Sequence, residues 1–286
     1  MDLLDSCNGL LLLRCTSAHE EPPSRPFYVV CNPATREWLV LPQPRHKPGV
    51  YAPAMLGFDP VVSPEFHVFQ LVQEPNYELS VEAVEIYSSE TGRWVFKEGD
   101  WSGNDMRLTG HMTYFNGFLH FCIISNSVAS VDTKGQSCRV SRVRHDAIGG
   151  YCTSVGHSQG RLLYVYDNVW ENDDMSVYFL EDHDNEEWVW TLKLNISKTD
   201  LFGPPTFRGG WNYYITAFHP DRDVIFFFDW SDKWLMSYDM KRRDVYDICA
   251  LQEVPYIEQG EFFAVHRLFL PYVPSYSGTL ASPSVN

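Results

Sequence analysis

The feature that most constrains the fold is a strand–turn–strand motif that occurs five times along the chain. Clear copies surround Asn8-Gly9, Asn116-Gly117 and Gln159-Gly160, and looser copies surround Asp59-Pro60 and Pro220-Asp221. Asn-Gly is the strongest short signal for a β-hairpin, because a type I′ turn needs positive φ at both of its central residues. The motif therefore predicts five hairpins, in a chain whose apolar residues show almost no helical period.

A second hairpin follows each first one. Its copies consist of an apolar strand, a polar turn and another strand, and they cover residues 28–38, 84–94, 128–135, 177–188 and 236–246. Two hairpins make a four-stranded unit that repeats roughly every 45–60 residues, the spacing of propeller blades. One such sheet cannot bury both of its faces, whereas blades stacked around an axis can. We therefore predict an all-β protein, a β-propeller of four-stranded antiparallel blades, with five clear blades and at most an incomplete sixth.

The predicted domain organisation is simple. Residues 1–270 form one propeller domain, in which residues 261–270 could supply one or two strands of the sixth blade. Residues 271–286 are rich in Pro and Ser and are predicted to be a disordered tail. Trp38, Trp94 and Trp188 hold similar places in their units, so we predict that they pack between neighbouring blades.

Composition argues against two classes of partner. The formal net charge of −15 opposes nucleic acid, because phosphate binding requires a basic surface. No apolar run approaches the roughly 18 residues that span a bilayer, and the first residues lack the basic start of a signal peptide, so no membrane partner is expected. The seven cysteines are an odd number, which fits reduced thiols. We expect a protein of the cytoplasm, the nucleus or both.

One motif invites a catalytic interpretation. Gly156-His157-Ser158-Gln159-Gly160 satisfies the Gly-x-Ser-x-Gly pattern of a nucleophile elbow. That elbow requires a strand, a sharp turn and then a helix, whereas residues 161–166 predict a second strand. We therefore interpret Ser158 as a structural turn residue and predict no catalytic residue. The histidines and cysteines show neither a His-Glu-x-x-His nor a Cys-x-x-Cys spacing, so no metal and no cofactor are predicted either.

The first hairpins also carry a family resemblance. Residues 4–12 and 30–42 together resemble the F-box-associated, kelch-like β-propeller domain of plant F-box proteins, and the likeness continues through residues 57–60, 87–94 and 266–269. The resemblance implies the substrate-recognition part of an F-box subunit of a cullin-type ubiquitin ligase, in which a propeller captures the target protein. In that family an F-box of short helices docks on the ligase adaptor. No F-box is recognisable in this chain, so we expect it to bind the cullin adaptor only if an upstream F-box exists in the full-length protein.

The leading prediction is therefore a non-catalytic protein-interaction module whose target protein has unknown identity. One alternative is a carbohydrate-binding or glycan-hydrolysing propeller, which as an enzyme would need two carboxylates flanking one bond. Another is a truncated product that lacks coupling to the ligase.

Strand order predicts where a partner would bind. Because successive strands are antiparallel, the long connections within and between blades share one face of the ring. Long loops on a rigid scaffold usually carry recognition, and Trp, Tyr and Arg are enriched among interface hot spots. About half of the candidates are expected to fold back onto the core instead. The predicted partner-binding residues are Tyr51, Trp101, Arg107, Trp170 and Trp211.

Overall fold

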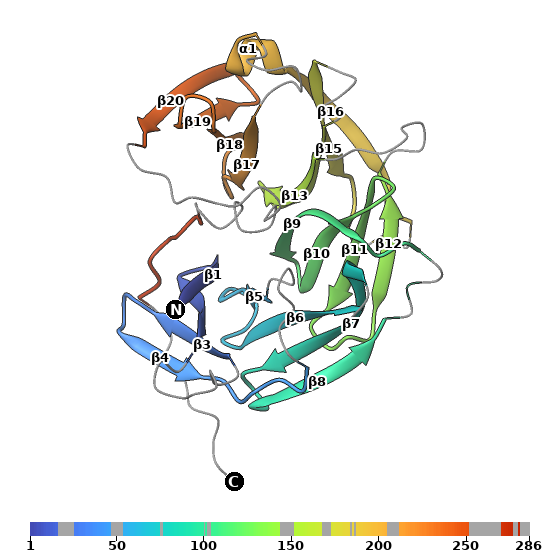
Figure 1. The fold of residues 1–286 in the computed structure, drawn as a ribbon, viewed down its shortest axis with the longest axis vertical. Helices are drawn as coiled ribbons and strands as arrows, with labels where there is room; N and C mark the ends of the chain where they lie inside the picture. The colour runs from blue at the N-terminus through green and yellow to red at the C-terminus, as the bar shows by residue number, and fades with distance from the viewer. Residues whose placement is uncertain are drawn as a thin grey trace.

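The computed structural model describes residues 1–16, 26–46, 54–74, 77–99, 101, 104–143, 152–167, 173–183, 185, 187–204, 212–251, 270–276 and 280. Its strands form blades arranged in a ring around one axis (Figure 1). Three sheets have four strands each, and an eight-stranded sheet consists of two further blades, which makes five. The prediction of an all-β propeller with five four-stranded blades is confirmed.

Each blade takes four consecutive strands, paired antiparallel in chain order. Blade I comprises β1 (Asp2–Cys7), β2 (Leu10–Cys15), β3 (Phe27–Asn32) and β4 (Glu37–Val40). Blade II comprises β5 (Ala54–Phe58), β6 (Phe66–Glu74), β7 (Tyr77–Ser88) and β8 (Arg93–Glu98). Blade III comprises β9 (Leu108–Phe115), β10 (Phe118–Ile123), β11 (Ser127–Asp132) and β12 (Cys138–Arg142). Blade IV comprises β13 (Cys152–Ser158), β14 (Arg161–Asp167), β15 (Asp174–Leu180) and β16 (Trp190–Ser197). Blade V comprises β17 (Tyr213–Phe218), β18 (Val224–Asp229), β19 (Trp234–Asp239) and β20 (Asp244–Ala250).

The first strand of each blade lies nearest the axis and the fourth lies at the rim (Figure 1). Blades III and IV are joined at the axis, where Gly110 of β9 pairs in parallel with Thr153 of β13. The innermost strands therefore form the wall of the central channel.

The tight turns adopt the backbone conformation that the hairpin motif requires. The φ angles are 45° and 89° at Asn8 and Gly9, 49° and 81° at Asn116 and Gly117, and 51° and 70° at Gln159 and Gly160. Positive φ at both central residues is the signature of the type I′ turn, whose twist matches that of the flanking strands.

Four apolar clusters fill the spaces between neighbouring blades. They join blades I and II, II and III, III and IV, and IV and V, through side chains such as Leu12, Phe121, Tyr164 and Phe227, each with no more than 1% of its surface exposed. Stacked blades thus bury the faces that a single sheet would leave exposed.

The three tryptophans do not all pack between blades as predicted. Trp94 lies in the space between blades I and II, with ring centroids 6.0 Å from Tyr28 and 5.5 Å from Tyr87, and Trp188 packs on the cluster of blades III and IV. The prediction is wrong for Trp38, which is 71% exposed. Trp38 pairs with Cys31, whereas its neighbour Leu39 pairs with Val30, so alternation along the strand places Leu39 against blade II and Trp38 on the opposite face.

The described residues contain one short helix, α1 (Lys198–Phe202), between blades IV and V, and no described helix is long and apolar enough to cross a membrane. The stretch 261–269, predicted to supply strands of a sixth blade, lies outside the described residues. Part of the predicted tail is described and contacts blade I. The side-chain amide of Asn32 donates to the carbonyl of Ser275 over 3.0 Å, and Leu280 packs on the cluster between blades I and II.

Candidate interaction face

The antiparallel order of the strands separates two ends of the ring. At one end, which we call the loop face, the second strand of each blade passes to the third and the fourth passes to the next blade. At the other end, the turn face, the first strand turns into the second and the third into the fourth. The long connections predicted to carry recognition therefore leave the blades at the loop face.

The connection from blade I to blade II is held by a buried carboxylate on β7. Glu85 is 1% exposed, and its two oxygens accept main-chain N–H groups from Arg45 at 2.9 Å and His46 at 3.0 Å. Gln70 of β6 adds a bond to the same carboxylate and a second to the carbonyl of His46, both over 3.2 Å. Charge-assisted bonds to a buried carboxylate are strong, so the described start of this connection, residues 41–46, is held against β7.

The connection from blade II to blade III is held by the same strand. The main-chain N–H of Val81 donates to the carbonyl of Met106 over 3.1 Å, and the indole of Trp101 donates to the carbonyl of Glu82 over 3.4 Å. Trp101 is only 8% exposed and packs edge-on against Phe121, with 6.0 Å between ring centroids. This predicted contact residue is therefore a wedge between blades II and III, which leaves little of its ring for a partner.

Arg107 is the one predicted contact residue that the structure describes as exposed. Its side chain is 51% exposed and forms a bidentate ion pair with Asp105. Nη2 lies 2.6 Å from Oδ2, and Nε lies 3.0 Å from each of the two carboxylate oxygens. These bonds from Arg107 lower the pKa of the Asp105 carboxyl. The backbone of Arg107 pairs with Ser80 of β7 in an isolated bridge. The guanidinium is thus fixed in direction at the loop face while a large part of it faces solvent.

The other three predicted contacts, Tyr51, Trp170 and Trp211, lie outside the described residues. They remain predictions. Their sequence positions place them in connections that start and end at the loop face.

The connection from blade IV to blade V starts at a buried network that the sequence analysis missed. Lys198 opens α1 with 0% of its surface exposed, and its Nζ lies 2.9 Å from Oδ1 of Asp167, the last residue of β14. The other carboxylate oxygen accepts a hydrogen bond from the hydroxyl of Tyr213, the first residue of β17. Burial raises the pKa of the Asp167 carboxyl, against the opposing effects of Lys198 and Tyr213. This network links two blades at the loop face.

The two buried carboxylates, Glu85 and Asp167, share one sequence signal that could have revealed them. Glu85 stands inside the apolar run Val84–Tyr87, and Asp167 closes the apolar run of β14. Charged residues are almost never fully buried unless they are paired, so a charge within a strand that must be buried predicts a specific partner. Which partner it takes depends on the packing of the blades, and the sequence alone does not supply that.

Ser158 lies in a strand–turn–strand geometry. It ends β13, pairs with Arg161 at the start of β14, and is separated from it by the turn at Gln159 and Gly160. A nucleophile elbow would continue into a helix, so the Gly-x-Ser-x-Gly match does not have the geometry of that motif. Among the described residues there is also no group of three or more His, Cys, Asp or Glu side chains that could hold a metal ion.

Comparison with known proteins identifies the family. Residues 1–259 match the family model described as F-box protein At3g26010-like, beta-propeller. F-box protein At5g07610 of Arabidopsis thaliana is 25% identical over 216 residues, which cover 70% of this chain and 50% of that protein. The chain thus spans about half the length of this curated relative.

Solved structures show a more distant likeness. A chain of a nidogen/laminin complex matches with a TM-score of 0.47 and 10% identity over 87% of this chain and 78% of that one. The computationally designed Ika8 protein matches with a TM-score of 0.44 and 10% identity over 86% and 60%. Neither likeness indicates a function. The family match covers most of the chain, and the chain therefore belongs to the family of F-box protein At3g26010-like β-propellers.

Proposed function

We propose that this propeller is a protein-interaction module that recognises the target of an F-box subunit of a cullin-type ubiquitin ligase. Membership of an F-box β-propeller family supports this proposal. The observation that carries it is the loop face, where two successive connections are anchored to one strand, β7, through Glu85 and through Ser80–Glu82. Loop segments that are anchored to a rigid scaffold suit recognition, because less conformational entropy is lost on binding.

The target is a protein, and binding involves no catalysis and no cofactor. We propose that Arg107 contacts it, together with one or two of Tyr51, Trp170 and Trp211. An exposed arginine already oriented by a carboxylate can form two parallel bonds to an acidic group of the partner. The working compartment in this proposal is the cytoplasm, the nucleus or both.

The experiment compares matched variants of the full chain. Partners captured from plant extract by the wild-type chain are purified, and their binding is then measured by titration calorimetry. Arg107→Ala is expected to weaken a genuine target by about 2 kcal/mol, or roughly thirtyfold. The control is Arg93→Ala, since Arg93 is an exposed arginine that begins β8 at the turn face, and it is expected to leave binding unchanged. Loss of binding with Arg93→Ala alone would place the interface on the other face.

Coupling to the ligase is tested separately. Purified cullin adaptor is mixed with residues 1–286 and with a full-length protein that carries an F-box. We expect the adaptor to bind the second and not the first. Stoichiometric binding of the adaptor by residues 1–286 would contradict the proposed division of roles.

A carbohydrate-binding alternative would give a different result. It predicts saturable binding of a plant oligosaccharide by the same chain and no dependence of protein capture on Arg107.

A further inference from the structure

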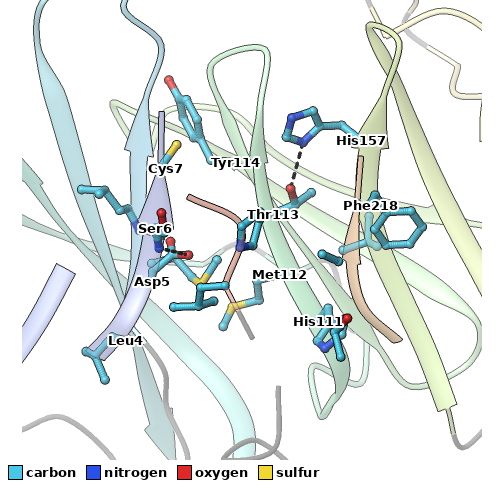
Figure 2. Close-up of a pocket in the computed structure, with 18 of the residues that line it drawn as sticks. Leu4, Asp5, Ser6, Cys7, His111, Met112, Thr113, Tyr114, His157 and Phe218 are labelled. Atoms are coloured by element: carbon cyan, nitrogen blue, oxygen red, sulfur yellow. Dashed lines mark hydrogen bonds between the residues drawn. The ribbon is translucent and has the colours of Figure 1, made fainter. Parts of the chain in front are cut away.

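The described segment 270–276, which follows the last blade in the chain, begins at the axis of the ring. Leu270 and Pro271 line a cavity of about 170 Å³, and the rest of its wall comes from the innermost strands of the five blades. Figure 2 shows Cys7 of β1 and Phe218 of β17 on two sides of this cavity. The segment therefore starts beside the first strands of the blades.

The same segment is held against blade I at the turn face. The side-chain amide of Asn32, the last residue of β3, donates to the carbonyl of Ser275 over 3.0 Å. A Cβ atom at Gly9 would lie 2.5 Å from Cβ of Ser275 and 3.0 Å from the carbonyl oxygen of Val273, so the segment runs directly past the first tight turn. These contacts fix the segment on the ring before any partner binds.

Two prolines three residues apart restrict the backbone of the segment. A proline fixes its own φ at about −65°, and it also confines the residue before it to extended conformations. Leu270, Pro271, Val273 and Pro274 are therefore all confined to the region of the polyproline II helix. Residues 270–276 belong to no α-helix or β-strand, and none of them has a positive φ, which agrees with this conformation.

Side-chain exposure along the segment repeats every third residue, as a helix of about three residues per turn requires. Tyr272 and Ser275 form one edge, which faces blade I: Tyr272 is 38% exposed and Ser275 is half-buried. Val273 and Tyr276 form the next edge and are 64% and 80% exposed. The two prolines form the third edge and are exposed as well. The ring thus covers one edge and leaves two edges open to a partner.

The two open edges carry two dipeptides of an apolar residue and a proline, Leu270-Pro271 and Val273-Pro274. Their spacing is that of the P-x-x-P motif, which docks in aromatic-lined grooves because its preformed helix loses little entropy on binding. Leu270 is half-buried beside the axial cavity, so Val273 and the prolines offer most of the contact. We infer that residues 270–274 are a docking motif for a protein domain of the SH3 type, whose aromatic-lined groove takes both dipeptides.

The charge of the chain narrows the choice of partner. None of the residues 270–276 is charged, and the chain as a whole has a formal net charge of −15. A groove with an acidic rim, which selects a basic residue beside the prolines, would be repelled. The groove that fits this motif therefore has a neutral or basic rim. Because the motif lies at the turn face, it leaves the loop face free and does not depend on the proposed function.

The probes are a set of purified SH3 domains that differ in the charge of the groove rim, and each is titrated into the full chain by calorimetry. At least one domain with a neutral or basic rim is expected to bind with a Kd in the micromolar range. Pro271→Ala and Pro274→Ala are each expected to weaken this binding about tenfold. Both prolines are exposed, so an unchanged Tm will show that the variants fold. Pro60→Ala, at an exposed proline of the turn between β5 and β6, is the matched control and should leave the affinity unchanged.

A second pair of variants tests which edges of the segment face the partner. Val273→Ala is expected to weaken binding about fivefold, because this side chain points away from the ring. Ser275→Ala keeps the main-chain carbonyl that binds Asn32 and is expected to leave the affinity unchanged. The inference is overturned if no SH3 domain of the set binds, if only domains with an acidic rim bind, if the proline variants bind as well as the wild type, or if Ser275→Ala weakens binding as much as Val273→Ala.

Discussion

The hydroxyl of Ser158 lies 2.7 Å from the main-chain carbonyl oxygen of His219, on the next blade of the ring. The same hydroxyl lies 2.7 Å from the carbonyl oxygen of Arg222, and Ser158 is 2% exposed. Its single proton is therefore shared between two acceptors of blade V. The serine of the Gly-x-Ser-x-Gly motif therefore links the tight turn of blade IV to the turn between the first two strands of blade V through hydrogen bonds.

Ser158→Ala is expected to destabilise the protein by about 1 to 2 kcal/mol, because two main-chain carbonyls of blade V lose a part-buried hydrogen bond from the serine hydroxyl. Urea unfolding of the two proteins measures this difference. Ser176→Ala, which removes an exposed hydroxyl, should cost about 0.5 kcal/mol or less and serves as the control. Covalent labelling of Ser158 by a fluorophosphonate probe would contradict the structural role.

Gly156→Ala is expected to destabilise the fold by about 1 to 3 kcal/mol, because the added methyl group would overlap the ring of Phe218. The reason is tested by a double-mutant cycle. In a Phe218→Leu background the same substitution should cost clearly less, since the smaller side chain leaves room. An equal cost in both backgrounds, again measured by urea unfolding, would show that the ring is not the obstacle.

The hairpins could be predicted from the sequence because their determinants are local. Asn8-Gly9 and Asn116-Gly117 select the turn, and the apolar strands on both sides select the pairing. Five repeats of the same unit then leave a ring of blades as the simplest way to bury both faces of each sheet. Family resemblance pointed to the same fold through the motifs of the first blade.

The side-chain positions could not be predicted in the same way, because they depend on register and on the neighbouring blade. Trp38 and Trp94 occupy similar places in their motifs, yet one is 71% exposed and the other is packed between blades. Trp101 follows a strand in a long connection but folds back onto Phe121. The buried network of Lys198, Asp167 and Tyr213 depends on the relative placement of segments that are far apart in the chain.

Stability is expected to fall as the pH is lowered from 7.0 to 5.5. Burial lowers the pKa of His111 to about 4 and that of His120 to about 3, both below the value of about 6.5 in the unfolded chain. A group whose folded pKa is lowered contributes stability above its unfolded pKa and loses it as the pH falls, because the unfolded state takes up the proton first. Each histidine should account for about 1 kcal/mol over this interval.

Urea unfolding at the two pH values measures this loss, and the same measurement on His111→Gln isolates one histidine. The variant should lose about 1 kcal/mol less than the wild type between pH 7.0 and 5.5. Equal losses in the two proteins would mean that His111 is not the source.

Lys198→Met is expected to be the most damaging of these substitutions, at about 3 to 5 kcal/mol. The ammonium group of Lys198 is the cation beside the buried carboxylate of Asp167, and methionine would leave that charge uncompensated. Because Lys198 opens α1, the substitution should also disturb the connection from blade IV to blade V at the loop face.

Lys193→Met is the matched control for this prediction. Lys193 pairs with Asp223 over 2.5 Å, but the two side chains are 26% and 21% exposed, so water can replace the partner and the expected cost is about 1 kcal/mol or less. Asp167→Asn should recover part of the stability lost in Lys198→Met, because the double variant leaves no buried charge. Thermal unfolding of Lys198→Met, Asp167→Asn, their double variant and Lys193→Met measures these costs. Equal costs for Lys198→Met and Lys193→Met would show that burial of the Lys198 pair does not set its contribution.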